Sequence, residues 1–369
     1  MMSRQIITYE RLLPLVPLKK PLGKFCNLQS GDCIVTFSRH EIYELKKEVE
    51  SDGKHLCSVV YGSLPPETRT RQALMFNDVK SEMDVLVASD AIGMGLNLNI
   101  SRIIFSTMQK FDGSEHRTLT IPEIKQIAGR AGRYGSSFPV GEVTCLNSQD
   151  LPIVHSALNS PSPLLQVFFP LKFDSFKLQY TPQKAGLFPS FDLLYMYSRL
   201  HSNSSLLTIL EHFVNNAKLS ENYFIVDSEN MLRNAAIIDG LPLSLLHKYL
   251  FCISPVDIND EISCAGLTQF AEKFATKGLV RLKEIFTPGS LKVPENQKQL
   301  KELESVHKVL DLYVWLSYRL DGFPDRELAA SQKSLCNMLI EEFLERLGWQ
   351  RSITRRKLTR RIAASLDKR

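Results

Sequence analysis

Two arginines stand among glycines and alanines in the segment QIAGRAGRYG, residues 126–135. Gln126, Arg130 and Arg133 follow the spacing i, i+4, i+7, so on a helix they would share one face. An amide and two guanidinium groups that point the same way can bind an anion. Arginine faces on helices are more often simply solvated, and the spacing alone leaves both interpretations open.

The helix that would carry these side chains is predicted from its own sequence. A threonine–glutamate capping box begins at Thr120, and the pattern predicts a helix over about residues 121–134. Gly129 and Gly132 would each cost about 1 kcal/mol relative to alanine inside that helix. This cost favours the interpretation in which some other group must approach the backbone closely.

Composition is that of an ordinary globular protein of 369 residues, with 44% hydrophobic and 23% charged residues. No apolar run is long enough for a membrane span. The seven cysteines form no CxxC pair, which indicates reduced structural residues and no metal site.

The net charge of +5 is concentrated in residues 351–369, which hold eight Lys/Arg and one Asp. Leu358, Ile362 and Leu366 recur every four residues there, so the segment is a candidate basic amphipathic helix. Phosphate backbones are the natural partner of such a helix. A solvated chain terminus is an equal alternative.

Short β-branched runs alternate with polar helical stretches over residues 31–147. This order predicts an α/β fold, a parallel sheet with helices on both faces. The predicted strands are CIVTF (33–37), SVVY (58–61), DVLVA (84–88), RIIFS (102–106) and EVTC (142–145), and the stretches at 39–51 and 67–78 are the predicted helices between the first three. Ligands of such sheets bind at the carboxyl ends of the strands. Beyond about residue 155 helical patterns dominate, and an all-α C-terminal region is expected.

Small polar residues follow three of these strands. Ser38 follows the first, Ser63 the second and Ser89 the third. Hydroxyl groups at such positions can hold phosphate oxygens without reading a base sequence. Each serine could equally cap a turn.

Four segments, taken together and in this order, resemble the second RecA-like lobe of DExH-type helicases of the second superfamily. They are CIVTFSR, YGSLPPETR, VLVASDAIGMGLN and QIAGRAGR, which correspond to helicase motifs IV, IVa, V and VI. Within that superfamily the chain resembles the mitochondrial degradosome RNA helicases of the suppressor-of-var family. The segments LPLSLLHKYLFC, GLTQFAEKF and ESVHKVLDLYVWLSYRL extend this likeness from about residue 8 to about residue 347.

The resemblance implies roles for the residues of motif VI. Gln126, Arg130 and Arg133 match the side chains that face the γ-phosphate of ATP, where arginine fingers stabilise charge on the transferring phosphoryl group.

It also implies contacts outside motif VI. Ser38, Ser63 and Ser89 match positions on the RNA backbone, and the segment 93–97 (Gly93, Gly95 and Asn97) matches the part of motif V that couples RNA contacts to nucleotide. An Asp-Gly pair at 112–113 predicts a hairpin. The resemblance implies that this hairpin helps to part duplex strands, as a projection at this place does in related helicases. Phe111 at its tip is a candidate to stack on a base, although a buried phenylalanine is commoner.

The first lobe of the family is not found in this sequence. No G-x-x-x-x-G-K-[ST] loop and no strand ending in Asp-Glu-x-His is present. ATP and Mg²⁺ are therefore expected to bind mainly to that other lobe, and the chain alone is predicted not to hydrolyse ATP. We expect it to be part of a longer protein or a shortened isoform.

The resemblance predicts a second RecA-like lobe at 1–155, a helical domain that closes over RNA at 156–295, a C-terminal helical segment at 296–347 and a basic tail at 348–369. Its expected partners are RNA, either a single strand or a duplex with an overhang, and a degradosome ribonuclease, in the mitochondrial matrix and without membrane insertion. No targeting sequence is visible.

The predicted function is an ATP-dependent RNA helicase represented by its C-terminal half. The alternative is a non-catalytic module, derived from a helicase, that binds RNA or a degradosome partner. An unrelated α/β enzyme has little support, because no nucleophile or acid/base pair is present.

Overall fold

The computed structural model describes residues 11–366 apart from 12, 94, 113–114, 134, 136, 162–184, 188, 201–203, 218–222, 227 and 288, and the side chains of the last helix as far as Leu347. The chain divides into two compact units. The first contains residues 1–163 and 341–369, and the second contains residues 164–340.

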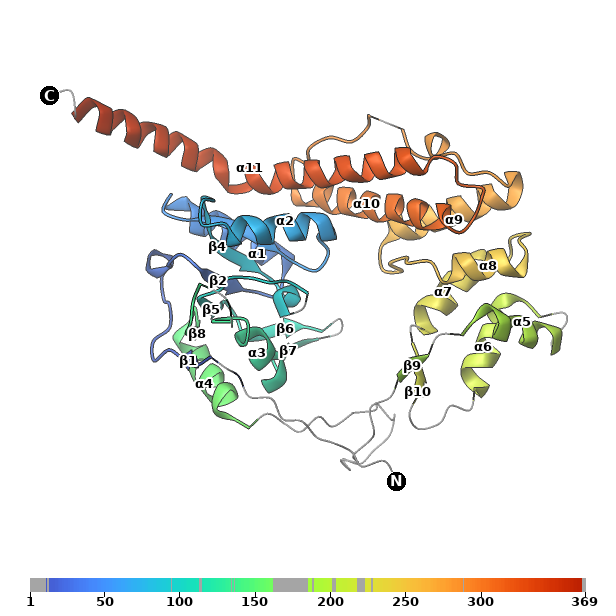
Figure 1. Cartoon of the computed structure of the whole chain (residues 1–369), viewed down its shortest axis with the longest axis horizontal. Coiled ribbons are helices and arrows are strands. Elements are labelled where there is room, and N and C mark those ends of the chain that lie inside the picture. The colour runs from blue at the N-terminus through green and yellow to red at the C-terminus, as the bar shows by residue number, and fades with distance from the viewer. Residues whose placement is uncertain are drawn as a thin grey trace. The chain divides into compact units, whose positions relative to one another are not determined.

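A six-stranded, wholly parallel sheet forms the centre of the first unit (Figure 1). Its strands, in spatial order, are β1 (Leu15–Pro17), β8 (Gly141–Cys145), β5 (Arg102–Phe105), β2 (Asp32–Val35), β4 (Met83–Ala88) and β3 (Leu56–Val60). All four residues of β2 are buried, as expected for a central strand covered on both faces. The predicted α/β class and all five predicted strands are confirmed.

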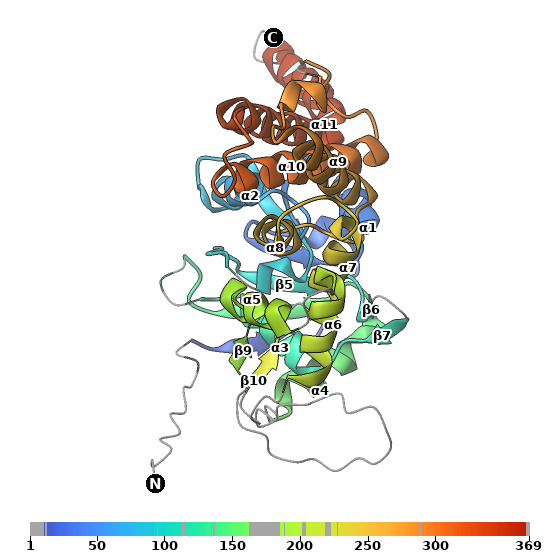
Figure 2. The ribbon, with the colours of Figure 1, turned by 90° about the vertical axis from the view of Figure 1, so that its right-hand side faces the viewer.

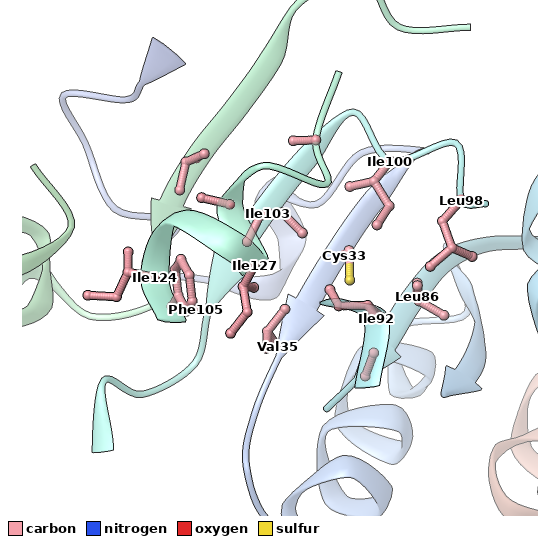
Figure 3. Packing of buried hydrophobic residues seen from close by; sticks show 14 of the residues in the cluster. Cys33, Val35, Leu86, Ile92, Leu98, Ile100, Ile103, Phe105, Ile124 and Ile127 are labelled. Carbon is pink, nitrogen blue, oxygen red and sulfur yellow. The ribbon is translucent and has the colours of Figure 1, made fainter. Parts of the chain in front are cut away.

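Four helices cover this sheet: α1 (Arg39–Ser51), α2 (Pro66–Asn77), α3 (Ile121–Ala128) and α4 (Leu151–Asn159). Buried side chains of α2, α3 and α4 share one hydrophobic cluster with alternate strand residues, such as Cys33 and Val35 of β2. Figure 3 shows Ile124 and Ile127 of α3 within that cluster. The buried residues of α1 are not in the cluster, so α1 covers the other face of the sheet.

A two-stranded antiparallel hairpin lies between β5 and α3. It consists of β6 (Gln109–Phe111) and β7 (His116–Thr118), with Phe111 opposite His116. The hairpin extends away from the sheet (Figure 1). The hairpin predicted around the Asp-Gly pair is therefore confirmed.

The second unit is helical, as predicted. It contains α5 (Phe191–Leu200), α6 (Leu206–Asn216), α7 (Ser228–Ile238), α8 (Leu245–Cys252), α9 (Glu261–Lys277), α10 (Gln297–Ser317) and the first part of α11 (Arg326–Leu366), with a short parallel pair of β9 (Ala185–Leu187) and β10 (Tyr223–Ile225). Helices α9, α10 and α11 lie side by side (Figures 1 and 2). Gly266 of α9 permits this closeness, because a Cβ there would lie 2.9 Å from the side chain of Val309.

The part of α11 that belongs to the first unit packs against α1 and α2. The ring of Phe343 meets the ring of Tyr43 edge to face, with centroids 6.5 Å apart. Nη1 of Arg71 lies 2.5 Å from a carboxylate oxygen of Glu341. Helical structure continues to Leu366, so residues 351–366 of the basic segment are helical, which is one of the two alternatives that the sequence left open.

The segment after α3 passes very close to the start of β8. Gly132 has φ = 58°, and a Cβ on it would lie 2.1 Å from the backbone nitrogen of Gly141. In turn, a Cβ on Gly141 would lie 2.4 Å from the carbonyl oxygen of Ala131. The close backbone approach expected from these glycines is present at Gly132, and the backbone that it approaches belongs to this same sheet.

We expect Gly132→Ala to lower the free energy of unfolding by about 3 kcal/mol, from a left-handed conformation unfavourable to alanine and from the clash with β8. Gly135→Ala is the matched control, because Gly135 also has a positive φ but a methyl group added there would meet no atom within 4 Å. Urea unfolding of both variants measures the difference. If both variants lost the same free energy of unfolding, the contact between Gly132 and the start of β8 would be shown to tolerate a side chain.

Candidate functional site: the arginine loop and the carboxyl edge of the sheet

The helix that carries Gln126 is shorter than predicted. Its capping box at Thr120 is present, but α3 ends at Ala128. Residues 129–133, here called the arginine loop, turn away from the helix. Ala131 forms a parallel bridge with Ile100, and the N–H of Gly132 donates to the carbonyl of Ile100 at 2.9 Å. The prediction of one helix to residue 134 is therefore wrong, because backbone pairing with a distant segment replaces the helical pattern.

The three predicted anion-binding side chains are thus divided between α3 and the arginine loop. Gln126 and Arg133 are exposed and Arg130 is half-buried. Burial, and then the neighbouring charge of Arg133, lower the pKa of Arg130. In the described part of the chain no acidic side chain pairs with either arginine. Two neighbouring guanidinium groups without a counter-charge create a positive potential that attracts anions.

Gln126 also contacts the loop that follows β4. Its side-chain nitrogen lies 3.4 Å from the position that a Cβ on Gly93 would take. Gly93 is buried beneath it, whereas Gly95 and Asn97 farther along the same loop are exposed. The structure therefore brings Gly93 to Gln126 but leaves Gly95 and Asn97 on the surface.

One side chain at the end of α2 holds the far part of this loop. Nδ2 of Asn77 donates to the carbonyl of Asn97 at 2.7 Å, and Oδ1 of Asn77 accepts from the N–H of Asn99 at 2.8 Å. The loop then leads directly into Ile100, the backbone partner of the arginine loop. Asn77 thus anchors the segment that positions Ala131 and Gly132.

The three predicted RNA-contacting serines differ in their local bonds. Ser38 is the N-cap residue of α1, yet its hydroxyl makes no capping hydrogen bond. Ser63 accepts a hydrogen bond from Nη2 of Arg39. Ser89 accepts from the N–H of Ala91 at 3.1 Å, so it stabilises a turn while its own O–H stays available as a donor.

Two arginines near these serines were not singled out by the sequence reasoning. Arg39, the residue after Ser38, lies 5.5 Å over the ring of Tyr61 and bonds Ser63. Arg69 of α2 has a buried Nε–H without a partner in the described part of the chain. The signal that could have found Arg39 is its position just beyond the carboxyl end of β2, whereas Arg69 lies near the start of α2.

A cavity of about 360 Å³ lies at this edge of the sheet. Its lining combines residues of motifs IV to VI with the hairpin: Phe37, Gly62, Arg69, Asp90, Ala91, Lys110, Leu119, Glu123, Gln126 and Ile127. The cavity shows that segments far apart in the sequence meet at one place, as the strand order requires.

Charged side chains connect the hairpin to the cavity. Nζ of Lys110, on β6, lies 2.5 Å from Asp90 and 3.9 Å from Glu123. Arg117, on β7, donates to both carboxylate oxygens of Glu123, at 2.8 and 2.9 Å. Phe111 is 51% exposed, so it is a surface residue and not a core residue. Its ring lies 5.3 Å from that of His116.

The described residues hold no group of three or more His, Cys, Asp or Glu side chains that could bind a metal. Among the described helices, none has both the length and the apolar character needed to cross a membrane.

Comparison with protein families agrees with this architecture. Residues 18–135 match the helicase conserved C-terminal domain. Residues 233–275 match Suv3 C-terminal domain 1, and residues 300–346 match the ATP-dependent RNA helicase SUV3 C-terminal domain.

Curated relatives match nearly the whole chain. The "ATP-dependent RNA helicase SUV3, mitochondrial" of Oryza sativa subsp. japonica is 67% identical over 93% of this chain and 57% of its own length. The "DExH-box ATP-dependent RNA helicase DExH16, mitochondrial" of Arabidopsis thaliana is 64% identical over 92% of this chain and 57% of its own length. The chain therefore spans about half the length of these relatives.

The parallel sheet, the arginine loop and the matched domain together define the second RecA-like lobe of a helicase. The two further domain matches and the identity of the relatives are more specific. The chain corresponds to the C-terminal part of the SUV3 family of DExH helicases, as its motifs indicated.

The ion pairs of Glu123 predict an acid-sensitive contribution to stability. Hydrogen bonds from Arg117, and then from Thr120, lower the pKa of Glu123 from 4.5 to about 2 against the opposing effect of burial. Because the pKa is lowered in the folded state, the stabilisation is complete above about pH 4.5 and is lost as the pH falls through about 2.

We expect Glu123→Gln to lower the free energy of unfolding by about 1–2 kcal/mol at pH 7, with solvent screening allowed for, and the difference from wild type to fall to roughly half by pH 3. Urea unfolding between pH 7 and pH 3 measures it. Glu115→Gln, an exposed hairpin carboxylate, controls for the loss of one charge. A difference that stays constant down to pH 3 would contradict the ion-pair explanation.

Proposed function

We propose that the chain is the C-terminal half of an ATP-dependent RNA helicase, in which the arginine loop and Gln126 face the γ-phosphate of ATP. The observation that carries this proposal is the pair Arg130 and Arg133, neighbouring cations with no acidic partner in the described part of the chain. The relatives are themselves named ATP-dependent RNA helicases.

The chemistry follows from charge. During hydrolysis, negative charge spreads over the oxygens of the transferring phosphoryl group, and fixed cations stabilise it. Arg130 and Arg133 would supply those cations, and the Gln126 amide would hydrogen-bond a phosphate oxygen or the attacking water. The cradle for the other phosphates and the ligands of Mg²⁺ would come from the first lobe. This chain alone would then not hydrolyse ATP.

The RNA backbone would lie along the carboxyl ends of β2, β3 and β4. Ser38 offers an uncommitted hydroxyl, Ser63 is held by Arg39, and Ser89 retains its O–H donor. Arg39 adds a positive charge beside two of these hydroxyls. Such contacts bind phosphates of any sequence, which suits an enzyme that moves along RNA.

The hairpin would act where the strands of a duplex separate. Phe111 is exposed beside His116, so both rings are available to stack on a base. Lys110 and Arg117 connect that hairpin to Asp90 and Glu123. Movement of the hairpin on RNA would therefore be transmitted to the loop after β4 and to α3.

The loop after β4 would couple RNA binding to the nucleotide. Gly93 contacts Gln126, and Gly95 and Asn97 lie on the stretch that leads to Ile100, the partner of the arginine loop. A shift of Ser89 on RNA would thus reach the groups proposed to face ATP.

The remaining regions fit the same proposal. Residues 156–295 would close over the RNA strand and 296–347 would form the family's C-terminal segment. A basic tail at 348–369 would follow and contact RNA or a degradosome ribonuclease. The relatives are named mitochondrial proteins, and we propose the mitochondrial matrix as the location.

The ATP-facing role is tested by joining this chain to the N-terminal part of the rice relative that lies outside the match. The fusion should hydrolyse ATP in an RNA-stimulated manner, and Arg133→Ala should lower kcat about 10³-fold or more. Arg233→Ala, at an exposed ion pair on α7, should leave kcat unchanged. An Arg133→Ala fusion that hydrolyses ATP at the normal rate would overturn the assignment.

The RNA-backbone role is tested on the chain itself by fluorescence anisotropy with a labelled single-stranded RNA. Arg39→Gln should weaken binding of different sequences equally and should reduce the slope of log Kd against log salt by about 0.7, the value for one phosphate contact on a single strand. Lys47→Gln, on the exposed part of the same helix, is the matched control. An unchanged slope for Arg39→Gln would exclude a phosphate contact there.

A further inference from the structure

The segment that leads into β1 places one arginine directly on the arginine loop. Nη1 of Arg11 donates to the carbonyl of Gly129 at 2.9 Å. Nη2 donates to the carbonyl of Gly132 at 2.9 Å and also to that of Ala131. Three carbonyls of one short loop thus converge on a guanidinium that is more than 110 residues away in the sequence.

These carbonyls need a partner because the helix has ended. The last carbonyls of a helix and those of the turn that follows find no N–H donor within the helix itself. On its other side the loop is held by Ile100 through the bridge to Ala131 and the hydrogen bond from Gly132. Arg11 and Ile100 therefore fix the loop backbone from two directions.

The guanidinium of Arg11 is occupied by the protein itself. A guanidinium has five N–H donors. Nε donates to the carbonyl of Leu13 at 2.7 Å, and the three bonds to the arginine loop use three more. One donor remains, so Arg11 is suited to hold backbone and not to bind a phosphate as Arg130 and Arg133 would. Partial burial removes water from the guanidinium and lowers the pKa of Arg11.

We propose that Arg11 is a positioning residue for the arginine loop: its guanidinium fixes the backbone from which Arg130 and Arg133 project. The consequence for catalysis rests on the function proposed above for those two side chains. The planar guanidinium of arginine can donate to three carbonyls at once, whereas the compact ammonium group of lysine does not present its donors in that planar arrangement. Arg11→Lys is therefore not a conservative change at this position.

Hydrogen–deuterium exchange of the chain tests the structural part of the proposal. Arg11→Ala should speed exchange in the peptide that covers residues 129–133 by about tenfold or more, and Arg11→Lys should give an intermediate rate. A peptide from the second unit, such as residues 297–317, should exchange as in wild type in both variants. Unchanged exchange at 129–133 in the two variants would overturn the proposal. If Arg11→Ala fails to fold, Arg11→Lys alone decides the matter.

The catalytic part is tested in the fusion with the rice N-terminal region. Displaced arginines should lower kcat by about tenfold to hundredfold in Arg11→Ala, while the KM for ATP changes by no more than about twofold. Faster exchange at 129–133 together with a normal kcat would overturn a positioning role. Normal ATP hydrolysis by Arg133→Ala would instead overturn the function proposed for the arginines, and the exchange data would still decide whether Arg11 fixes the loop.

Discussion

The site depends on one backbone contact, the crossing of the arginine loop with the start of β8. Neither Gly132 nor Gly141 has room for a side chain, and Ala131 pairs with Ile100 at the same place. This close packing ends helix α3 early and turns the chain out of the helix. Arg130 and Arg133 therefore project from a loop that the sheet itself holds, which limits how far they can move.

A second constraint is electrostatic and lies at the opposite end of α3. Glu123 completes the capping box with Thr120, and it also accepts two hydrogen bonds from Arg117 of the hairpin. One carboxylate thus stabilises the start of the helix and attaches the hairpin to it. Lys110 extends the attachment to Asp90 in the loop after β4. The hairpin, the helix and this loop form one charged network at the mouth of the cavity.

The sequence predicts the elements of the first unit well because burial determines them. β-branched runs such as residues 84–88 have one stable environment, the inside of a parallel sheet, and the polar helix expected at 39–51 is α1 itself. The end of α3 could not be predicted in this way. Nothing in the spacing of residues 126–134 reveals that Ile100 will pair with Ala131, and this distant pairing outweighs local helix preference.

In the candidate site too, some features could be predicted from the sequence and others depend on contacts between distant residues. The spacing of Gln126 singled it out and the resemblance gave it a role, but its surroundings came only from the structure. Arg11 bonds carbonyls 118 to 121 residues away, a relation that no periodicity expresses. The sequence spacing of the charged residues around Glu123 is likewise compatible with separate, solvated surface charges, so it does not predict that they form one network.

The side-chain amide of Asn77 holds the backbone of the loop after β4 at two points. Its NH₂ group donates to the carbonyl of Asn97 and its oxygen accepts from the N–H of Asn99. Slow deamidation would convert this side chain to a carboxylate of nearly the same shape, which keeps the acceptor but loses the donor. The carbonyl of Asn97 would then face a negative charge. Deamidation of this one residue at the end of α2 would therefore weaken the attachment of the loop that leads to Ile100, the backbone partner of the arginine loop.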